Sequence, residues 1–255
     1  MTDGVTDGVT DGVTDGVGEA PDTAVPVVGW RVWRLGGDRT GPELVSPAVT
    51  AGWPARTAMT AACRRGCPSA PAWDCGCGLY ATTTLDLLLP SFTDAGAVLG
   101  CVALWGRVVE ADRGWRAEHA YPLLALAPRP DAVAQALERS LTEQALERYL
   151  SRGALRVQRV RLLARLRSSA RPDADVVHAL GTRYGVPAHL VGGALPSVPD
   201  AVVARRAEAV RDEAARGLAA RRLGDAHARR RFDRAVEDLV AALGRRADPG
   251  SPISA

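Results

Sequence analysis

The chain has 255 residues, and all 32 of its basic side chains other than histidine are arginine, against 29 aspartates and glutamates. The absence of lysine excludes P-loop NTPases, protein kinases and Schiff-base enzymes, because each of these requires a lysine amine. Residues 1–128 contain 9 arginines and 14 acidic side chains, whereas residues 129–255 contain 23 and 15. All six tryptophans and all five cysteines also lie in the first half, and this step in composition predicts a domain boundary near residue 128.

Both ends of the chain have the composition of unfolded segments. Residues 2–17 are four copies of Thr-Asp-Gly-Val, which carry too little apolar surface to fold. We therefore expect a disordered leader over residues 1–26 and a disordered tail over residues 247–255. No run of 18 apolar residues is present and the N-terminus has no apolar signal segment, so we expect a cytoplasmic chain with no membrane partner.

Residues 27–128 predict a small antiparallel β domain, because apolar and polar side chains alternate in several short runs. The predicted strands are 28–35, 44–46, 97–111 and 115–127, and of these 97–111 is predicted because it is β-branched and apolar. The last two should pair across a turn between Ala111 and Gly114. Residues 51–78 are rich in Gly, Pro and Cys and predict an irregular loop, while 79–89 could be a strand or a short helix.

Residues 129–246 predict an all-helical, arginine-rich domain, because apolar side chains recur there every three or four residues. The predicted helices are 131–150, 155–166, two short ones within 173–195, 199–223 and 226–243. The last of them should bury one face, formed by Phe232, Val236, Leu239, Val240 and Leu243. The whole chain is then of the α+β class, and its long amphipathic helices leave a homodimer open.

Four cysteines lie within 15 residues of one another, at Cys63, Cys67, Cys75 and Cys77. Four thiolates separated by turn-forming residues can enclose one tetrahedral zinc ion, which would hold a loop too polar to fold by packing alone. Four protein ligands leave no open position, so the predicted role of the zinc is structural. Free thiols and disulfides remain the alternatives, although a reducing compartment favours metal. Cys101, in the middle of a predicted strand, should be a core residue.

Two sequence strings resemble a known group of proteins. Cys75-Gly-Cys-Gly-Leu-Tyr-Ala81 and Gly100-Cys-Val-Ala-Leu-Trp-Gly106 are similar to short, uncharacterised actinobacterial proteins with no assigned activity, over about residues 28–127. The position of Cys67 is a histidine in many of these proteins, a replacement that a zinc site tolerates. The resemblance implies a zinc-stapled β domain and no particular activity.

A ligand pocket is conceivable around Glu110, Arg116 and Glu118, which lie on two neighbouring predicted strands. The alternative, which we favour, is an ordinary ion pair at the surface. No set of nucleophile, base and orienting group is recognisable, so an enzyme is the lesser alternative.

Residues 177–194 match the spacing of a helix-turn-helix, with Gly185 in the turn. Only His189 of the would-be recognition helix could read a base, and a plain pair of helices fits equally well. Basic side chains that could meet phosphate are Arg148, Arg152, Arg156, Arg159, Arg229, Arg230 and Arg231. Solvated or paired arginines are again the alternative.

The pattern as a whole favours a non-enzymatic interaction or adaptor protein with a structural zinc site and a protein partner. The alternative is a regulator associated with nucleic acid through residues 177–194 and the arginine-rich helices.

Overall fold

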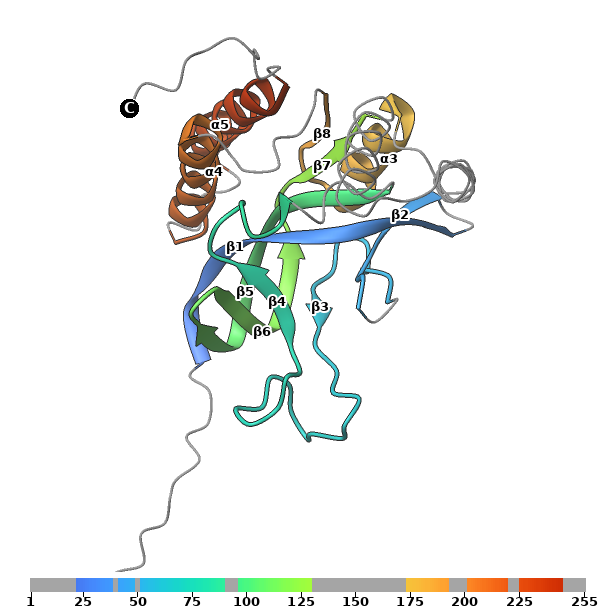
Figure 1. The fold of residues 1–255 in the computed structure, drawn as a ribbon, viewed down its shortest axis with the longest axis vertical. Coiled ribbons are helices and arrows are strands. Elements are labelled where there is room, and N and C mark those ends of the chain that lie inside the picture. The colour runs from blue at the N-terminus through green and yellow to red at the C-terminus, as the bar shows by residue number, and fades with distance from the viewer. Residues whose placement is uncertain are drawn as a thin grey trace, which may run out of the picture.

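The computed structural model describes residues 22–38, 41–48, 51–89, 96–129, 173–192, 201–219 and 225–244. Within these ranges a mostly antiparallel sheet is combined with three helices, so the predicted α+β class is confirmed (Figure 1). The predicted tail, the helices predicted over 131–150 and 155–166, and residues 1–21 of the predicted leader lie outside the described residues. No helix in the described ranges is both long and apolar enough to cross a membrane.

The sheet contains eight strands in the order β2-β1-β4-β6-β5-β7-β8, with β3 pairing to β6. Their bounds are β1 Asp22–Asp38, β2 Gly41–Val45, β3 Met59–Thr60, β4 Leu79–Thr82, β5 Ala97–Ala111, β6 Gly114–Pro122, β7 Ala125–Pro128 and β8 Ala188–Val191. Because β1 also pairs with β5, the pairings β1–β4, β4–β6, β6–β5 and β5–β1 close a ring of four strands. The predicted hairpin is confirmed, with Ala111 opposite Gly114.

Strand β1 is longer than its alternating pattern predicts. It begins at Asp22, opposite Arg107 of β5, so residues 22–26 are not part of a disordered leader as we expected. The pairing shifts register between Thr23 and Val27, and the strand therefore continues past an irregularity that interrupts the local pattern. Farther along, alternate side chains face opposite sides of the strand, and Trp30 and Trp33 consequently belong to two different hydrophobic clusters.

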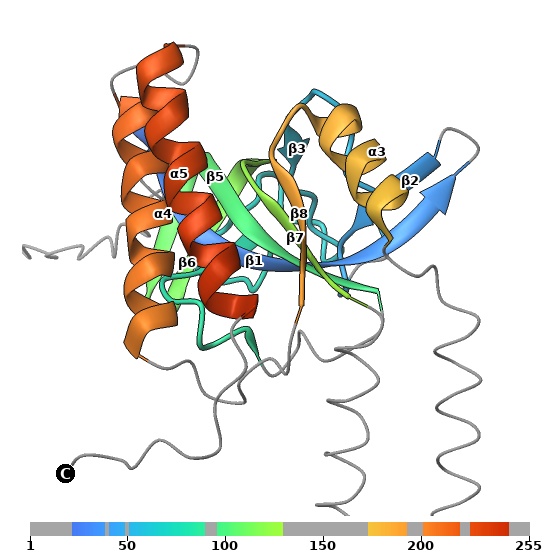
Figure 2. The same ribbon diagram turned by 90° about the horizontal axis from the view of Figure 1, so that it is seen from above.

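The helices are α3 (Ala174–Tyr184), α4 (Ala201–Ala219) and α5 (Ala226–Gly244). Helices α4 and α5 lie side by side over one face of the sheet (Figure 2). The predicted face of α5 is confirmed: Phe232, Val236, Leu239 and Leu243 are buried and Val240 is partly buried. Helix α3 packs on a separate cluster, in which Leu180 and Tyr184 meet Leu44 and the two rings of Trp33 and Trp53.

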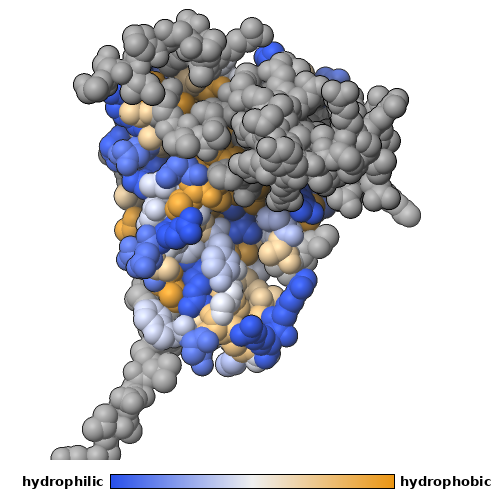
Figure 3. Space-filling view, in the orientation of Figure 1, coloured by the Kyte–Doolittle hydropathy of each residue, from blue (hydrophilic) through white to orange (hydrophobic). Residues whose placement is uncertain are grey.

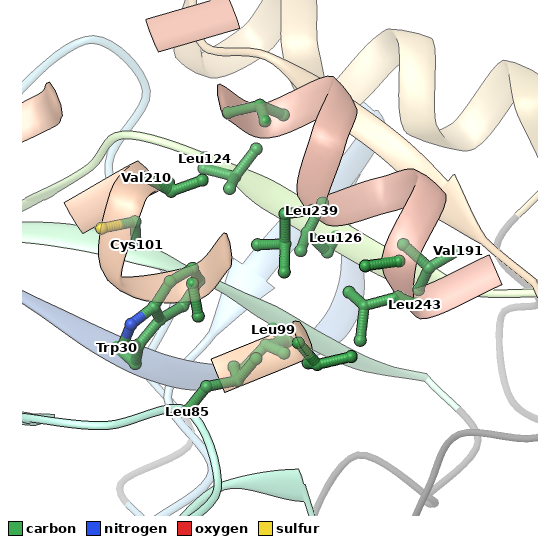
Figure 4. Close-up of a cluster of buried hydrophobic side chains, with 14 of the residues drawn as sticks. Trp30, Leu85, Leu99, Cys101, Leu124, Leu126, Val191, Val210, Leu239 and Leu243 are labelled. Carbon is green, nitrogen blue, oxygen red and sulfur yellow. The ribbon is translucent and has the colours of Figure 1, made fainter. Parts of the chain in front are cut away.

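The C-terminal segments share one core with the sheet. Leu239 and Leu243 of α5 and Val210 of α4 pack with side chains of the sheet, among them Trp30 and Leu99 (Figure 4). Cys101 is fully buried in the same cluster, as predicted. The step in composition near residue 128 is therefore not a boundary of the hydrophobic core.

The prediction of an all-helical second half is wrong at residues 188–191. These residues form β8, which pairs in parallel with β7 and places His189 opposite Leu126. Two hydrogen bonds extend the pairing at its ends: Ala125 donates to the Pro187 carbonyl at 3.0 Å, and Arg129 donates to the Val191 carbonyl at 2.9 Å. A segment of four residues acquires this structure only from a partner strand that is distant in sequence.

Candidate metal centre

The four clustered cysteines lie on the irregular loop between β3 and β4, as the sequence predicts. We call residues 61–78 the cysteine loop; it lies at the end of the molecule away from all three helices (Figure 1). At this end, hydrophilic side chains are exposed beside apolar ones (Figure 3). The loop has no regular structure of its own, so side chains and any bound ion must hold it in place.

The thiols of Cys63, Cys67, Cys75 and Cys77 are brought together in space. Their sulfur atoms all lie within 4.8 Å of one another, and the Sγ atoms of Cys63 and Cys75 are 3.8 Å apart. All four cysteines are free, so the cluster contains no disulfide. A tetrahedral ion with bonds to sulfur of about 2.3 Å has sulfur–sulfur edges of about 3.8 Å. The cluster could therefore hold one metal ion with little rearrangement.

Backbone amides donate hydrogen bonds to two of the sulfur atoms and so stabilise the thiolate form. The amide of Arg65 donates to Cys63 Sγ and the amide of Ala72 donates to Cys77 Sγ, both at 3.3 Å. The Cys67 amide also donates to Cys63 and lowers the pKa of that thiol to about 6. The Cys67 thiol donates a hydrogen bond to Cys63, which raises the pKa of Cys67 to about 12, and burial raises the pKa of Cys77. One thiolate is thus favoured among neighbouring thiols, and a cation would allow the others to ionise.

Arg116 of β6 ties the cysteine loop to the sheet. Its guanidinium donates to the carbonyl oxygens of Ala72 at 2.8 Å, Trp73 at 2.9 Å and Cys77 at 3.1 Å, and also to that of Cys75. Four carbonyls from one irregular segment therefore share a single donor group. Gly78 leaves room for this side chain, because a Cβ there would lie 3.0 Å from the Cβ of Arg116, and its φ of +129° suits glycine.

A second arginine supports the start of β4, where the cysteine loop ends. Arg31 donates to the Tyr80 carbonyl and to Ser46 Oγ, and its guanidinium lies 5.1 Å from the centre of the Trp53 ring. Burial lowers the pKa of Arg31 to about 10, so the side chain stays charged at neutral pH. The Tyr80 hydroxyl donates back to the Gly76 carbonyl within the loop. Sequence reasoning missed Arg31 because its partners, the Tyr80 carbonyl, Ser46 and Trp53, are brought to it only by the fold.

The structure does not assemble the ligand pocket considered for Glu110, Arg116 and Glu118. Arg116 is engaged with the cysteine loop, and Glu118 accepts from Arg107 at 3.3 Å. The Arg107 hydrogen bonds lower the pKa of Glu118, although its burial acts in the opposite direction. Glu110 is exposed near the end of β5. The ion pair we favoured exists, but it joins Glu118 to Arg107 and not to Arg116.

Residues 177–194 form neither the helix-turn-helix nor the plain pair of helices that we considered. Helix α3 is present, and Gly185 ends it with the predicted left-handed backbone, at φ 67°. The segment expected to be the recognition helix is β8, inside the sheet, and His189 is half-buried there. Burial lowers the pKa of His189, which favours the neutral ring. No helix is presented to a DNA groove by this segment.

The predicted basic run on α5 is exposed but largely paired. Arg229 donates to Asp233 at 3.0 Å, and Arg231 donates to Glu213 of α4 at 3.2 Å. Arg230 is exposed on the same turn. The other predicted phosphate contacts, at Arg148, Arg152, Arg156 and Arg159, lie outside the described residues. The pairing of Arg229 and Arg231 agrees with the alternative of solvated or paired arginines.

Taken together, the described residues define a class: an α+β protein with a four-cysteine cluster able to hold one metal ion. Comparison of the chain with protein-family models, with curated proteins and with solved structures found no match.

Proposed function

We propose that this chain is a non-enzymatic interaction protein whose cysteine loop is held by a structural zinc ion and presents aromatic side chains to a protein partner. The observation that carries the proposal is the position of Trp73. Its side chain is 56% exposed, while its backbone carbonyl accepts from Arg116 in the segment between Cys67 and Cys75. A large apolar side chain is thus exposed on an anchored loop.

Zinc is the metal that the donor set favours. Four sulfur ligands are typical of zinc or of an iron–sulfur centre, and zinc binding needs the thiolates alone, without inorganic sulfide. All four positions are filled by protein, which leaves none for water or substrate. The ion would therefore stabilise the loop and take no part in a reaction.

A partner surface is supported by the side chains around the cluster. Tyr80 is 50% exposed at the end of the loop, and Arg64 and Arg65 are exposed beside Cys63. Tryptophan, tyrosine and arginine are the residues that contribute most to protein–protein binding. Because the loop is fixed before binding, less conformational entropy is lost on association.

The metal is tested by native mass spectrometry of the full chain. We expect one zinc ion on the wild type and none on a Cys75→Ser/Cys77→Ser double variant. Cys101→Ala is the matched control, because Cys101 is buried in the core and away from the cluster, and it should keep the ion. The proposal would be contradicted if the wild type carries no metal and if chelator leaves the hydrogen-exchange rates of the cysteine loop unchanged. The ion would then not be part of the fold.

The surface is tested by crosslinking and affinity capture with the full chain. Trp73→Ala should lose the captured partner while keeping zinc and thermal stability. Val202→Ala, which truncates an exposed apolar residue on α4, should retain it. A partner set unchanged by Trp73→Ala would remove the role proposed for the cysteine loop, and a partner released by nuclease would show that the loop meets nucleic acid instead.

A further inference from the structure

A cavity lies between the sheet and the helices, and none of the cysteine-loop residues lines it. Its volume is about 520 Å³, within the range of roughly 300–1,000 Å³ that small-molecule sites occupy. The walls come from β5, β6, the turn between α3 and β8, and both α4 and α5. The cavity therefore forms only when the sheet and the C-terminal helices are folded together.

Three aromatic side chains give this cavity its chemistry: Trp105 of β5, Tyr121 of β6 and Phe232 of α5. The hydroxyl of Tyr121 donates to the carbonyl of Tyr184 at 2.5 Å, so Tyr121 offers a ligand mainly its ring. Leu218 of α4 adds an aliphatic wall. Rings of this kind pack well against another flat ring, edge to face or offset.

Arg229 is the charged side chain that lines the cavity. Its Nε donates to both carboxylate oxygens of Asp233, at 3.0 and 3.3 Å, and this pair orients the guanidinium. Among the described residues, no acceptor is found for the two terminal nitrogens of Arg229. The side chain of Arg229 is exposed, so a small anion can reach it from solvent.

Arg229 also lines a second cavity, of about 330 Å³, together with Gly185, Val186 and Pro187 of the same turn. This second cavity has polar side chains in its wall, from His178 and Thr182 of α3. An apolar chamber and a more polar one thus meet at this turn, and Arg229 is the charged side chain common to both. The arrangement suits a molecule with an apolar body and a charged end.

We propose that these two cavities bind a small aromatic carboxylate, with its ring in the apolar chamber and its carboxylate on the terminal nitrogens of Arg229. The fork of a guanidinium matches the two oxygens of a carboxylate. The proposal does not depend on the zinc ion or on the surface of the cysteine loop. Its failure and the failure of the proposed function are therefore separate outcomes.

The test is calorimetric titration of the full chain with 2-naphthoate and with its neutral counterpart, 2-naphthalenemethanol. The wild type should bind the carboxylate more tightly than the alcohol. Arg229→Gln should weaken the carboxylate about tenfold, the lower limit for loss of a charge-assisted hydrogen bond, and leave the alcohol unchanged. Arg230→Gln is the matched control, because Arg230 lines neither cavity. Leu218→Trp, which fills the apolar chamber, should abolish binding of both probes.

The wild type supplies a readout that needs no variant. On addition of 2-naphthoate, the amide NMR signals of Gly185, Val186 and Arg229 should shift, and those of the cysteine loop should not. The proposal is overturned if the wild type binds neither probe, if it binds the alcohol as tightly as the carboxylate, if Arg229→Gln binds the carboxylate as the wild type does, or if the shifts fall elsewhere.

Discussion

Arg116 shows how one side chain can organise a segment that has no secondary structure. Its donors reach the carbonyls of Cys75 and Cys77, which belong to two of the four clustered cysteines. Groups that orient metal ligands commonly change metal affinity by about 10- to 100-fold when they are removed. The sulfur cluster therefore depends on a residue that contributes no ligand atom.

Replacing Arg116 with lysine should weaken zinc binding by about tenfold, because one ammonium cannot span four carbonyls. The measurement is a competition between the protein and a chromophoric chelator. Arg113→Lys, in the exposed turn between β5 and β6, provides the control and should leave the affinity unchanged. Equal zinc affinities for Arg116→Lys and the wild type would mean that the cysteine loop is organised by the ion alone.

Tyr184 connects α3 to β2 and to the segment that contains Trp53. Its buried hydroxyl accepts from the Leu44 amide and donates to the Trp53 carbonyl, each at 3.0 Å. Tyr184→Phe leaves both backbone groups without this partner and should cost about 1–3 kcal/mol in the free energy of unfolding. Denaturant titration measures the loss, and Tyr80→Phe, at an exposed hydroxyl, should cost less. A Tyr184→Phe variant as stable as the wild type would mean that water replaces the hydroxyl.

At the scale of elements, the helical hairpin is held by charges as well as by its apolar faces. Glu213 of α4 accepts from Arg216 at 2.8 Å and from Arg231 of α5 at 3.2 Å. The hydrogen bond from Arg216, with a further contribution from Arg231, lowers the pKa of Glu213 below its ordinary 4.5 despite the opposing effect of burial. A depressed pKa stabilises the folded state above the ordinary value, and this contribution is lost as pH falls through the folded pKa.

Glu213→Gln should therefore destabilise the protein by about 0.5–1 kcal/mol at pH 7 and by progressively less below pH 4.5. Thermal unfolding of Glu213→Gln and of the wild type at a series of pH values measures whether their stabilities converge as the pH falls. Glu208→Gln changes an exposed acid on the same helix and should have little effect at any pH. If the difference in stability between Glu213→Gln and the wild type stays constant down to the lowest pH, the ionised carboxylate of Glu213 is not its cause.

Local patterns predicted the elements that depend on local interactions. The β5–β6 hairpin has a strand-like run on each side of a tight turn, and α3 has Asp173 as its N-cap, which accepts from the Val176 amide at 2.8 Å. Strand β8 has no such signal, since Ala188–Val191 is only four residues long and its partner, β7, lies some sixty residues earlier. Similarly, the cysteine cluster was predictable from its ligand types, whereas Arg116 acts on backbone oxygens, which leave no trace in sequence.

For the whole molecule, the packing of the hydrophobic core shows which segments fold together, and the step in composition does not. One face of the sheet, with Trp30, Leu99 and Leu126, is covered by α4 and α5 (Figure 4). The charge difference between the two halves concerns exposed side chains and says nothing about which apolar faces meet. A domain boundary inferred from composition alone therefore separates two segments that pack together.

A chain ending at residue 192 should therefore fail to form a stable fold, because it leaves that face of the sheet exposed to water. We expect dye binding to exposed apolar surface and no cooperative thermal transition, whereas a chain ending at residue 244 should unfold like the full protein. Cooperative unfolding of the shorter chain, at a temperature near that of the full protein, would instead establish the sheet as an independent domain.

The order of the elements also has a consequence for synthesis. About 70 residues separate the end of β7 from the start of α4, and a ribosome adding 5–20 residues per second needs roughly 4–15 s to make them. Throughout that interval the helices that will cover the tryptophan and leucines of the sheet have not yet been made. Folding of this face is thus a late event of translation, and chaperones that shield apolar nascent chains are the first proteins that we expect this one to meet.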